Sequence, residues 1–246
     1  TENKHANSGW NVISISNATI EGDVDLKNAE VPFFTILTNC YFGNAVFLNL
    51  AQFKSGVRFN NSTFAGETDF RYMSVGGAFE ADGATFSRTD ATTNFGHMRV
   101  AGAVLLNNAV FNGPVDFKAA EFAGFHADGV HFLRDSDFES MKVKGPTTFY
   151  ASENHSAIFD GPARFYAMES ESVIANAAQF NKGSDFELVD VKRHAMFDGT
   201  IFKEKARFYG GKIGANFQAI NAVFGGPADF ERMNVDGYAL FRGTTF

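Results

Sequence analysis

The chain has little of several things on which ordinary folds depend. It contains one cysteine, five prolines and one tryptophan in 246 residues. The single Cys40 excludes an intramolecular disulfide and any zinc site built on several cysteines. No apolar run approaches the roughly 20 residues that span a bilayer as a helix, so the sequence predicts no membrane segment. Leucine is scarce as well, with nine residues against 30 phenylalanines. This ratio disfavours a helical domain, because leucine is the better helix former.

The charge balance excludes a further class of protein. Aspartate and glutamate together number 28 against 21 lysines and arginines, which leaves a formal charge of −7. A protein with this sign has no general attraction for nucleic acid, and we expect no nucleic-acid partner. Hydrophobic residues make up 45% of the chain. The chain can therefore bury a core and is not a disordered tail.

A repeat of about 22 residues runs through nearly the whole sequence. Tripeptides of the form small–any–aromatic mark it, as in Cys40-Tyr41-Phe42 and Ser62-Thr63-Phe64. Three further apolar series lie between these marks, so a large apolar residue recurs about every five or six residues. The fourth series is ragged, and its clear members are Phe59, Phe149, Phe197 and Phe241.

This period predicts an all-β fold. Five-residue steps wander around a helix and give no apolar face. Within each tripeptide the small residue and the aromatic residue point one way and the middle residue the other, which is the alternation of a strand. A chain with four such short strands per repeat must coil, and equivalent strands then stack about 4.8 Å apart. The sequence thus predicts a four-sided parallel β-solenoid of about ten coils.

Glycines mark one corner of each predicted coil. They follow the first-series aromatic residue by two positions, where we expect them to adopt positive φ. These glycines are Gly22, Gly66, Gly113, Gly161 and Gly226.

The stretch Ala109–Phe122 reads AVFNGPVDFKAAEF. It resembles the pentapeptide-repeat family in its Phe-rich variant, with A-x-F-x-G-x-x-x-F spacing. The resemblance covers nearly everything from residue 13 to residue 246. It implies a right-handed quadrilateral β-helix, usually bacterial. The coil is longer than the four pentapeptides of a strict member, so we expect some corners to be wider.

The repeat also predicts the domain organisation. We expect one β-helix domain over residues 13–246, preceded by a segment over 1–12 in which Trp10 caps the open N-terminal end. Two breaks in register predict loops at 88–92 and 151–156. We interpret these loops as tolerated surface insertions, with functional loops as the alternative.

Aspartates recur at the outward position of the second series. They are Asp25, Asp69, Asp116, Asp137, Asp185 and Asp229. One interpretation, which the resemblance supplies, is a mimic of B-DNA that binds a type II topoisomerase such as gyrase. Charge argues against it, because DNA of the same length of about 50 Å carries roughly 30 charges. Arg164 and Arg207 also interrupt the column, which favours ordinary cross-strand pairing.

The same carboxylates could belong to a carbohydrate-active β-helix enzyme. Glycosidic chemistry needs two carboxylates that converge on a groove, with environments that separate their pKa values. The aspartates instead form a single column along a convex side of the predicted solenoid. We therefore expect no catalytic residues.

Outward apolar residues on two adjacent sides form a candidate protein interface. Contiguous apolar patches mark partner surfaces, whereas scattered β-branched residues simply suit a strand. The two interpretations stay open, because His131 and Gln179 interrupt the column. The candidate residues are Val110, Ile158, Ile201 and Val223 in the first series and Met196 and Leu240 in the fourth.

We expect a non-enzymatic scaffold or protein–protein interaction module that needs no cofactor and no metal. Its partner is expected to be another protein, or a second copy joined laterally or end to end. The topoisomerase-binding DNA mimic and the carbohydrate-active enzyme are the alternatives. The compartment stays open between the cytoplasm and an extracytoplasmic location reached after the loss of a signal peptide.

Overall fold

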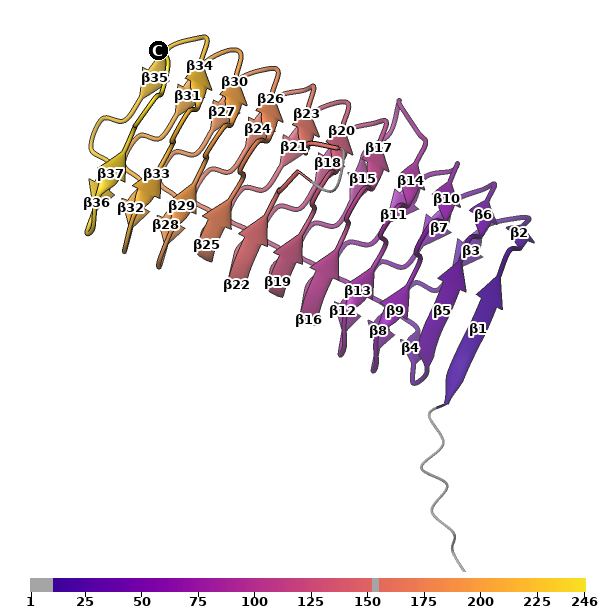
Figure 1. The fold of residues 1–246 in the computed structure, drawn as a ribbon. Coiled ribbons are helices and arrows are strands. Elements are labelled where there is room, and N and C mark those ends of the chain that lie inside the picture. Colours follow the sequence, from indigo (N-terminus) through magenta and orange to yellow (C-terminus); the bar gives the residue numbers. More distant parts are fainter. Residues whose placement is uncertain (1–10, 152–154) are drawn as a thin grey trace, which may run out of the picture.

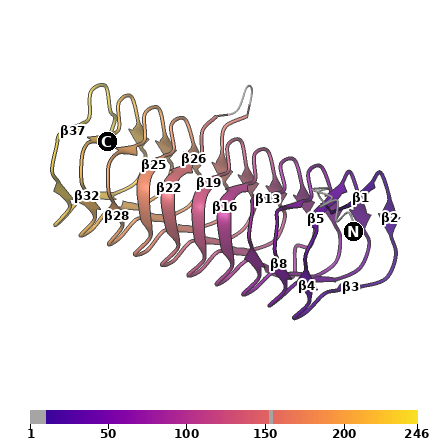
Figure 2. The same cartoon turned by 90° about the horizontal axis from the view of Figure 1, so that it is seen from below.

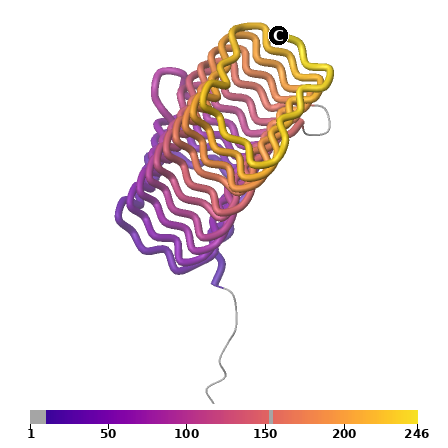
Figure 3. Tube along the Cα trace, turned by 90° about the vertical axis from the view of Figure 1, so that its left-hand side faces the viewer, coloured from indigo at the N-terminus to yellow at the C-terminus, as the bar shows by residue number. Residues whose placement is uncertain are grey.

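The computed structural model describes residues 11–151 and 155–246, and in those residues every regular element is a β-strand (Figure 1). The chain winds into a β-solenoid whose successive coils stack in parallel along one axis (Figure 3). Partners on neighbouring coils lie mostly 22 residues apart, as Phe42 and Phe64 do. The all-β, four-sided solenoid predicted from the repeat is confirmed. The predicted cap at Trp10 and part of the predicted loop at 151–156 lie outside the described residues.

Each coil contributes one strand to each of four faces, named here in chain order. The first face is a sheet of ten strands. Its strands are β2 (Thr19–Ile20), β6 (Tyr41–Phe42), β10 (Thr63–Phe64), β14 (Thr85–Phe86), β17 (Val110–Phe111), β20 (His131–Phe132), β23 (Ile158–Phe159), β26 (Gln179–Phe180), β30 (Ile201–Phe202) and β34 (Val223–Phe224).

The second face is a separate sheet of ten strands. Its strands are β3 (Val24–Asp25), β7 (Val46–Phe47), β11 (Thr68–Asp69), β15 (Thr93–Asn94), β18 (Val115–Asp116), β21 (Ser136–Asp137), β24 (Ala163–Arg164), β27 (Ser184–Asp185), β31 (Ala206–Arg207) and β35 (Ala228–Asp229).

The third and fourth faces belong to one sheet of 17 strands. The third face has β4 (Glu30–Val31), β8 (Gln52–Phe53), β12 (Ser74–Val75), β28 (Asp190–Val191), β32 (Lys212–Ile213) and β36 (Asn234–Val235). The fourth has β1 (Val12–Ser16), β5 (Phe34–Thr38), β9 (Val57–Arg58), β13 (Phe79–Glu80), β29 (Ala195–Met196), β33 (Phe217–Gln218) and β37 (Ala239–Leu240).

Four longer strands at the middle of the solenoid run through both of these faces (Figure 2). They are β16 (Arg99–Leu105), β19 (Glu121–His126), β22 (Lys142–Thr148) and β25 (Glu169–Ile174). Their pairings shift register at the corner between the two faces, as between Val100 and Ala103 on β16. The chain therefore crosses this corner without leaving the sheet.

Phenylalanine rings fill the interior in columns. On the first face the rings of Phe42 and Phe64 stack with centroids 4.8 Å apart and planes 6° apart. On the second face Phe165 and Phe186 stack at 4.5 Å and 2°. Rings of the two columns meet edge to face, with 79° between the planes of Phe165 and Phe180. Both geometries are favourable for aromatic pairs, so the columns support one another.

The fourth face explains the ragged fourth series. Each coil has two inward positions here, two residues apart in the chain. Together they have space for one ring. Phe79 is followed by Ala81, and all of their side-chain surface is buried. In another coil the order is reversed, with Ala195 before Phe197, both 2% exposed. In most coils the ring thus enters from one of the two positions, and a smaller residue such as alanine takes the other.

The corner glycines serve a different purpose from the one predicted. Of the five glycines, only Gly22 has positive φ. A Cβ at Gly66 would lie 2.2 Å from the backbone of Asn44 on the preceding coil. A Cβ at Gly161 would lie 2.3 Å from the carbonyl carbon of Arg134. Glycine is therefore required for the close approach of coils, and positive φ falls at other corners, for example at Asn39 and Leu50.

Both ends of the solenoid expose apolar side chains. Val12 at the N-terminal end is 46% exposed, and Phe246 in the last coil is 70% exposed. Aliphatic residues such as Ile20 and Leu26 stand where later coils have rings, and a hollow of about 450 Å³ opens among them. The ring columns are complete only between these ends.

The shared ring space predicts a compensating pair of substitutions. Phe79→Ala alone should lower the free energy of unfolding by about 3–5 kcal/mol, because it leaves a cavity. Ala81→Phe alone should cost about 1–3 kcal/mol through overpacking. The double variant should be more stable than Phe79→Ala, because its new ring fills the same space. Denaturant unfolding of the full chain measures all three, with Phe79→Ala/Ala84→Phe as the control that should recover nothing.

The glycine contacts predict unequal costs for two alanine substitutions at one kind of corner. Gly161→Ala should destabilise the chain by about 1–3 kcal/mol, because the added methyl group meets backbone that cannot rotate away. Gly183→Ala should change stability by no more than about 0.5 kcal/mol, since its nearest neighbour is the Lys205 carbonyl oxygen at 3.9 Å. Equal thermal midpoints for the two variants would contradict this account.

Candidate functional site

The aspartates of the second face each close a turn of the chain. The carboxylate of Asp116 accepts a hydrogen bond from the backbone N–H of Lys118 at 2.7 Å. Asp137 accepts one from Glu139 at 2.8 Å. The same bond to the residue two positions on occurs at Asp25, Asp69, Asp185 and Asp229. A short acidic side chain at this position is thus explained by the corner that follows each strand.

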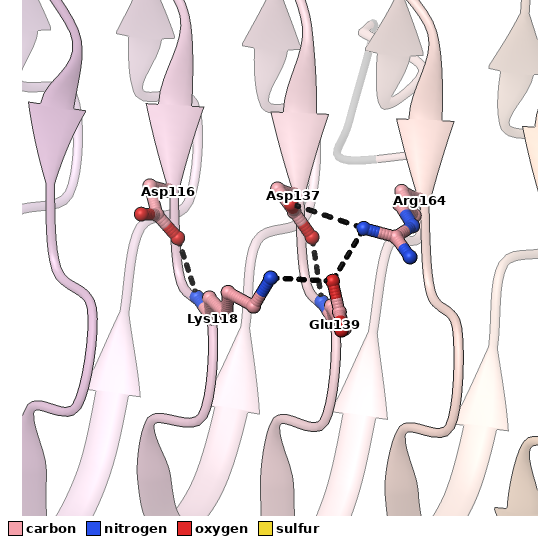
Figure 4. A network of polar contacts seen from close by, with 5 residues as sticks. All are labelled: Asp116, Lys118, Asp137, Glu139 and Arg164. Atoms are coloured by element: carbon pink, nitrogen blue, oxygen red, sulfur yellow. Dashed lines mark hydrogen bonds and ion pairs between the residues drawn. The ribbon is translucent and has the colours of Figure 1, made fainter.

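Cations from neighbouring coils neutralise this column. Asp116 pairs in register with Asp137, and Asp137 with Arg164. Lys118 Nζ lies 2.6 Å from Glu139 Oε2, and the Arg164 guanidinium contacts both Glu139 and Asp137 (Figure 4). Asp116 and Asp137 therefore belong to a network that includes cations rather than to an uninterrupted acidic strip.

Asp69 differs from the other aspartates in its burial. Only 6% of the residue is exposed, although the series predicts an outward side chain. Arg71 compensates the buried charge with a two-pronged contact, Nε at 2.9 Å and Nη2 at 2.7 Å from the two carboxylate oxygens. Such bidentate pairs are the strong form of the ion pair.

Asp137 and Glu139 are neighbouring carboxylates whose pKa values shift in opposite directions. Burial raises the pKa of Asp137, while the Glu139 N–H and Arg164 oppose that rise. The hydrogen bond from Lys118 lowers the pKa of Glu139, against the opposite effect of burial. Opposed pKa shifts characterise an acid–base pair. Here, however, Arg164 on the next coil contacts both groups, as in a structural ion-pair network (Figure 4).

The apolar candidates lie where the repeat places them, at outward positions of the first and fourth faces. Val110, Ile158, Ile201 and Val223 share one column. Val223 is 38% exposed and the other three are half-buried. His131 and Gln179 stand between them in register. On the fourth face, Gln218 separates Met196 from Leu240, both half-buried.

His131 is tied to a neighbouring polar group. Its Nε2 lies 2.7 Å from Asp160 Oδ2, and Asn181 donates to the other oxygen of that carboxylate. Polar contacts therefore cross the middle of the apolar column. The structure brings the apolar residues onto one side of the molecule but does not join them into an unbroken patch.

The third face carries a groove that sequence reasoning missed. Its volume is about 710 Å³, and it runs across the coils from Gln52 to Lys192. Inward residues such as Phe122 form its floor, and outward side chains form its two walls. A run of small residues at Gly76, Ala101 and Ala123 was the signal that could have revealed it.

Carboxylates occur in this groove, but each has a cationic neighbour. Glu121 lies 3.6 Å from Arg99, and Glu169 lies 2.9 Å from Lys142. Glu171 is 3.6 Å from Arg193. Each of these carboxylates thus belongs to an ion pair, and no two of them are set apart as the acid and base that glycosidic cleavage needs.

Among residues 11–151 and 155–246, no three side chains of histidine, cysteine, aspartate or glutamate are arranged to hold a metal ion. The described part of the chain also has no helix with the length and apolar character needed to cross a membrane.

The turn bond of the aspartates predicts a difference between two substitutions at one site. Asp116→Ala should lower the free energy of unfolding by about 1 kcal/mol, because the Lys118 N–H loses its acceptor. Asp116→Asn should cost less than half as much, because its amide oxygen can accept the same bond. Denaturant unfolding of both variants checks this. Equal losses would show that the negative charge matters and the turn does not.

Comparison with known proteins agrees with this geometry. The family model described as pentapeptide repeats (9 copies) matches residues 95–142. No curated protein and no solved structure matches the chain. The matched segment spans parts of coils whose inward rings and parallel pairing continue on both sides of it. Residues 95–142 are therefore similar to the pentapeptide-repeat family in sequence, in agreement with the solenoid geometry of these coils.

Proposed function

We propose that this chain is a non-catalytic scaffold or protein–protein interaction module that presents the outer faces of its solenoid to a protein partner. The observation that carries the proposal is the filled interior. Phe111 and Phe117 have no exposed surface, like most rings of the central coils. Only the outward side chains are therefore available to contact a partner.

The solenoid holds these outward side chains at fixed intervals. Val110 on β17 lies beside His131 on β20, which in turn lies beside Ile158 on β23. Each is one strand spacing of about 4.8 Å from the next. Because the backbone is already ordered, a partner that binds such a face costs little additional conformational entropy. A rigid, regular surface is the property expected of a scaffold.

The charge pattern favours the interaction module over the alternatives. A mimic of DNA needs dense unpaired negative charge along one side. On the second face, Arg164 and Arg207 stand in register among the aspartates. Arg207 also lies 2.5 Å from Glu187. A carbohydrate-active enzyme needs a carboxyl group free to donate a proton, whereas the carboxylates of the third-face groove are paired.

The candidate contact surface is the C-terminal half of the first face, with its neighbours Met196 and Leu240 on the fourth. Val223 is the most exposed of the four apolar candidates on the first face. Partly exposed β-branched side chains on a flat sheet bury further surface at little entropic cost when a partner covers them. We place the protein contact there.

The triple variant Ile158→Lys/Ile201→Lys/Val223→Lys tests the proposal. It should abolish co-purification of the protein partner from the source organism, because charged side chains on this surface resist desolvation. Cross-linking followed by mass spectrometry identifies what is captured. The matched control is Tyr41→Lys/Thr63→Lys/Thr85→Lys, which adds the same charge to the N-terminal half of the same face. Retention of the partner by the first variant would refute this interface, and a supercoiling assay with gyrase would reveal the DNA mimic.

A further inference from the structure

The outward charges of the third face alternate along the four central strands. Arg99, Glu121, Lys142 and Glu169 occupy the same position on β16, β19, β22 and β25, and each pairs in register with the next. Their side chains are 73%, 51%, 57% and 46% exposed, in that order. We call these four residues the charged column. Its sign pattern is plus, minus, plus, minus.

A second column lies two residues further along the same four strands. Its members are Ala101, Ala123, Lys144 and Glu171. The first two side chains are short and the last two are long and charged. We call these four residues the stepped column. The groove runs between the two columns, over inward residues such as Val100 and Val143.

Reversing the charged column gives a complementary pattern. Consider two copies whose third faces meet about a two-fold axis that is parallel to the strands and passes between β19 and β22. The coils of the second copy then run in the opposite order, while each column lies against the same column of the second copy. Glu121 then meets Lys142 of the second copy. Arg99 meets Glu169 of the second copy. Every charge in the column faces its opposite.

The stepped column is complementary under the same operation. Ala123 meets Lys144 of the second copy, and Ala101 meets Glu171 of the second copy. A long side chain therefore always enters the space above a short one. Cross-strand pairing within one molecule accounts for the alternation of the charged column. It gives no reason for the order of the stepped column.

The same residues disfavour a dimer in which the coils of the two copies run in the same order. A two-fold axis along the solenoid keeps coil order but places the charged column against the stepped column. Lys142 then faces Lys144 of the second copy, and Glu169 faces Glu171 of the second copy. Like charges in direct opposition are unfavourable.

We propose that the third face binds the third face of a second copy of this chain in an antiparallel, two-fold symmetric dimer centred between β19 and β22. This proposal concerns a different face from the proposed partner surface, so either can fail while the other stands. The intramolecular pairs Arg99–Glu121 and Lys142–Glu169 join across the axis into one network of eight charges.

The size of the face predicts a weak dimer. Ten coils at about 4.8 Å and a width of about 10 Å give roughly 500 Å² per copy. The total of roughly 1,000 Å² is at the lower limit of specific interfaces. Because the contacts are exposed ion pairs, salt screens them, and the dimer should weaken between about 0.05 M and 0.5 M salt.

Charge reversal with rescue tests the dimer. Glu121→Lys and Lys142→Glu are made separately in the full chain, and dimerisation is measured by sedimentation equilibrium at low salt. Each variant alone should dimerise at least tenfold more weakly than the unaltered chain, because like charges then meet twice across the axis. An equimolar mixture of the two variants should regain the dimer, since opposite charges again meet at both contacts.

Two controls separate this result from misfolding and from the first-face interface. Glu231→Lys makes the same charge change on the second face, where the side chain is 68% exposed, and should leave dimerisation unchanged. Rescue in the mixture shows that both variants are folded. An unaltered chain that stays monomeric at millimolar concentration would overturn the proposal. So would failure of the mixture to associate, or a dimer lost only in the first-face lysine variant.

Discussion

The stacking of each coil on the next is the constraint on which everything else in this molecule depends. Every side chain lies against its counterpart one coil away, so a residue must fit beside nearly a copy of itself. Flat rings do this well, and Phe159 and Phe180 stack at 4.5 Å. Where the backbone of two coils comes closest, only glycine fits, as at Gly161. Where the fourth face narrows, one ring and one alanine share a strand, as Phe79 and Ala81 do.

The same constraint arranges the surface. Like charges on adjacent coils repel at close range. Where acidic residues do meet in register, as Asp116 and Asp137 do, a cation from a neighbouring coil contacts one of them. Lys118 reaches Glu139 on the next coil, and Arg207 reaches back to Glu187. Aspartates occur where the chain must turn, and their charge is compensated locally. Surface residues therefore repeat once per coil, as the core residues do. The faces of the solenoid can thus make regularly spaced contacts.

The sequence predicts the first and second faces well, because their rings stay at one position in every coil from Phe64 to Phe224. It predicts the fourth face poorly. The ring there moves between two positions that point the same way, and a search for one fixed position finds only Phe59, Phe149, Phe197 and Phe241. Glycine at a corner is equally ambiguous, since steric closeness and positive φ both call for it. The groove depends on strands that cross a corner, from β16 to β25, and such long-range pairing leaves little trace in local spacing.

The four long strands β16, β19, β22 and β25 also affect how the molecule unfolds under a pulling force. A force that pulls its two ends apart acts along the solenoid axis. It loads the backbone hydrogen bonds between neighbouring coils, so the coils separate one after another. The C-terminal coils, held by strands of two residues on every face, open at low force. The central coils share longer ladders, such as the five residue pairs between β22 and β25. The middle of the solenoid should thus remain wound after the C-terminal coils have been drawn out, and it limits how far the chain extends under load.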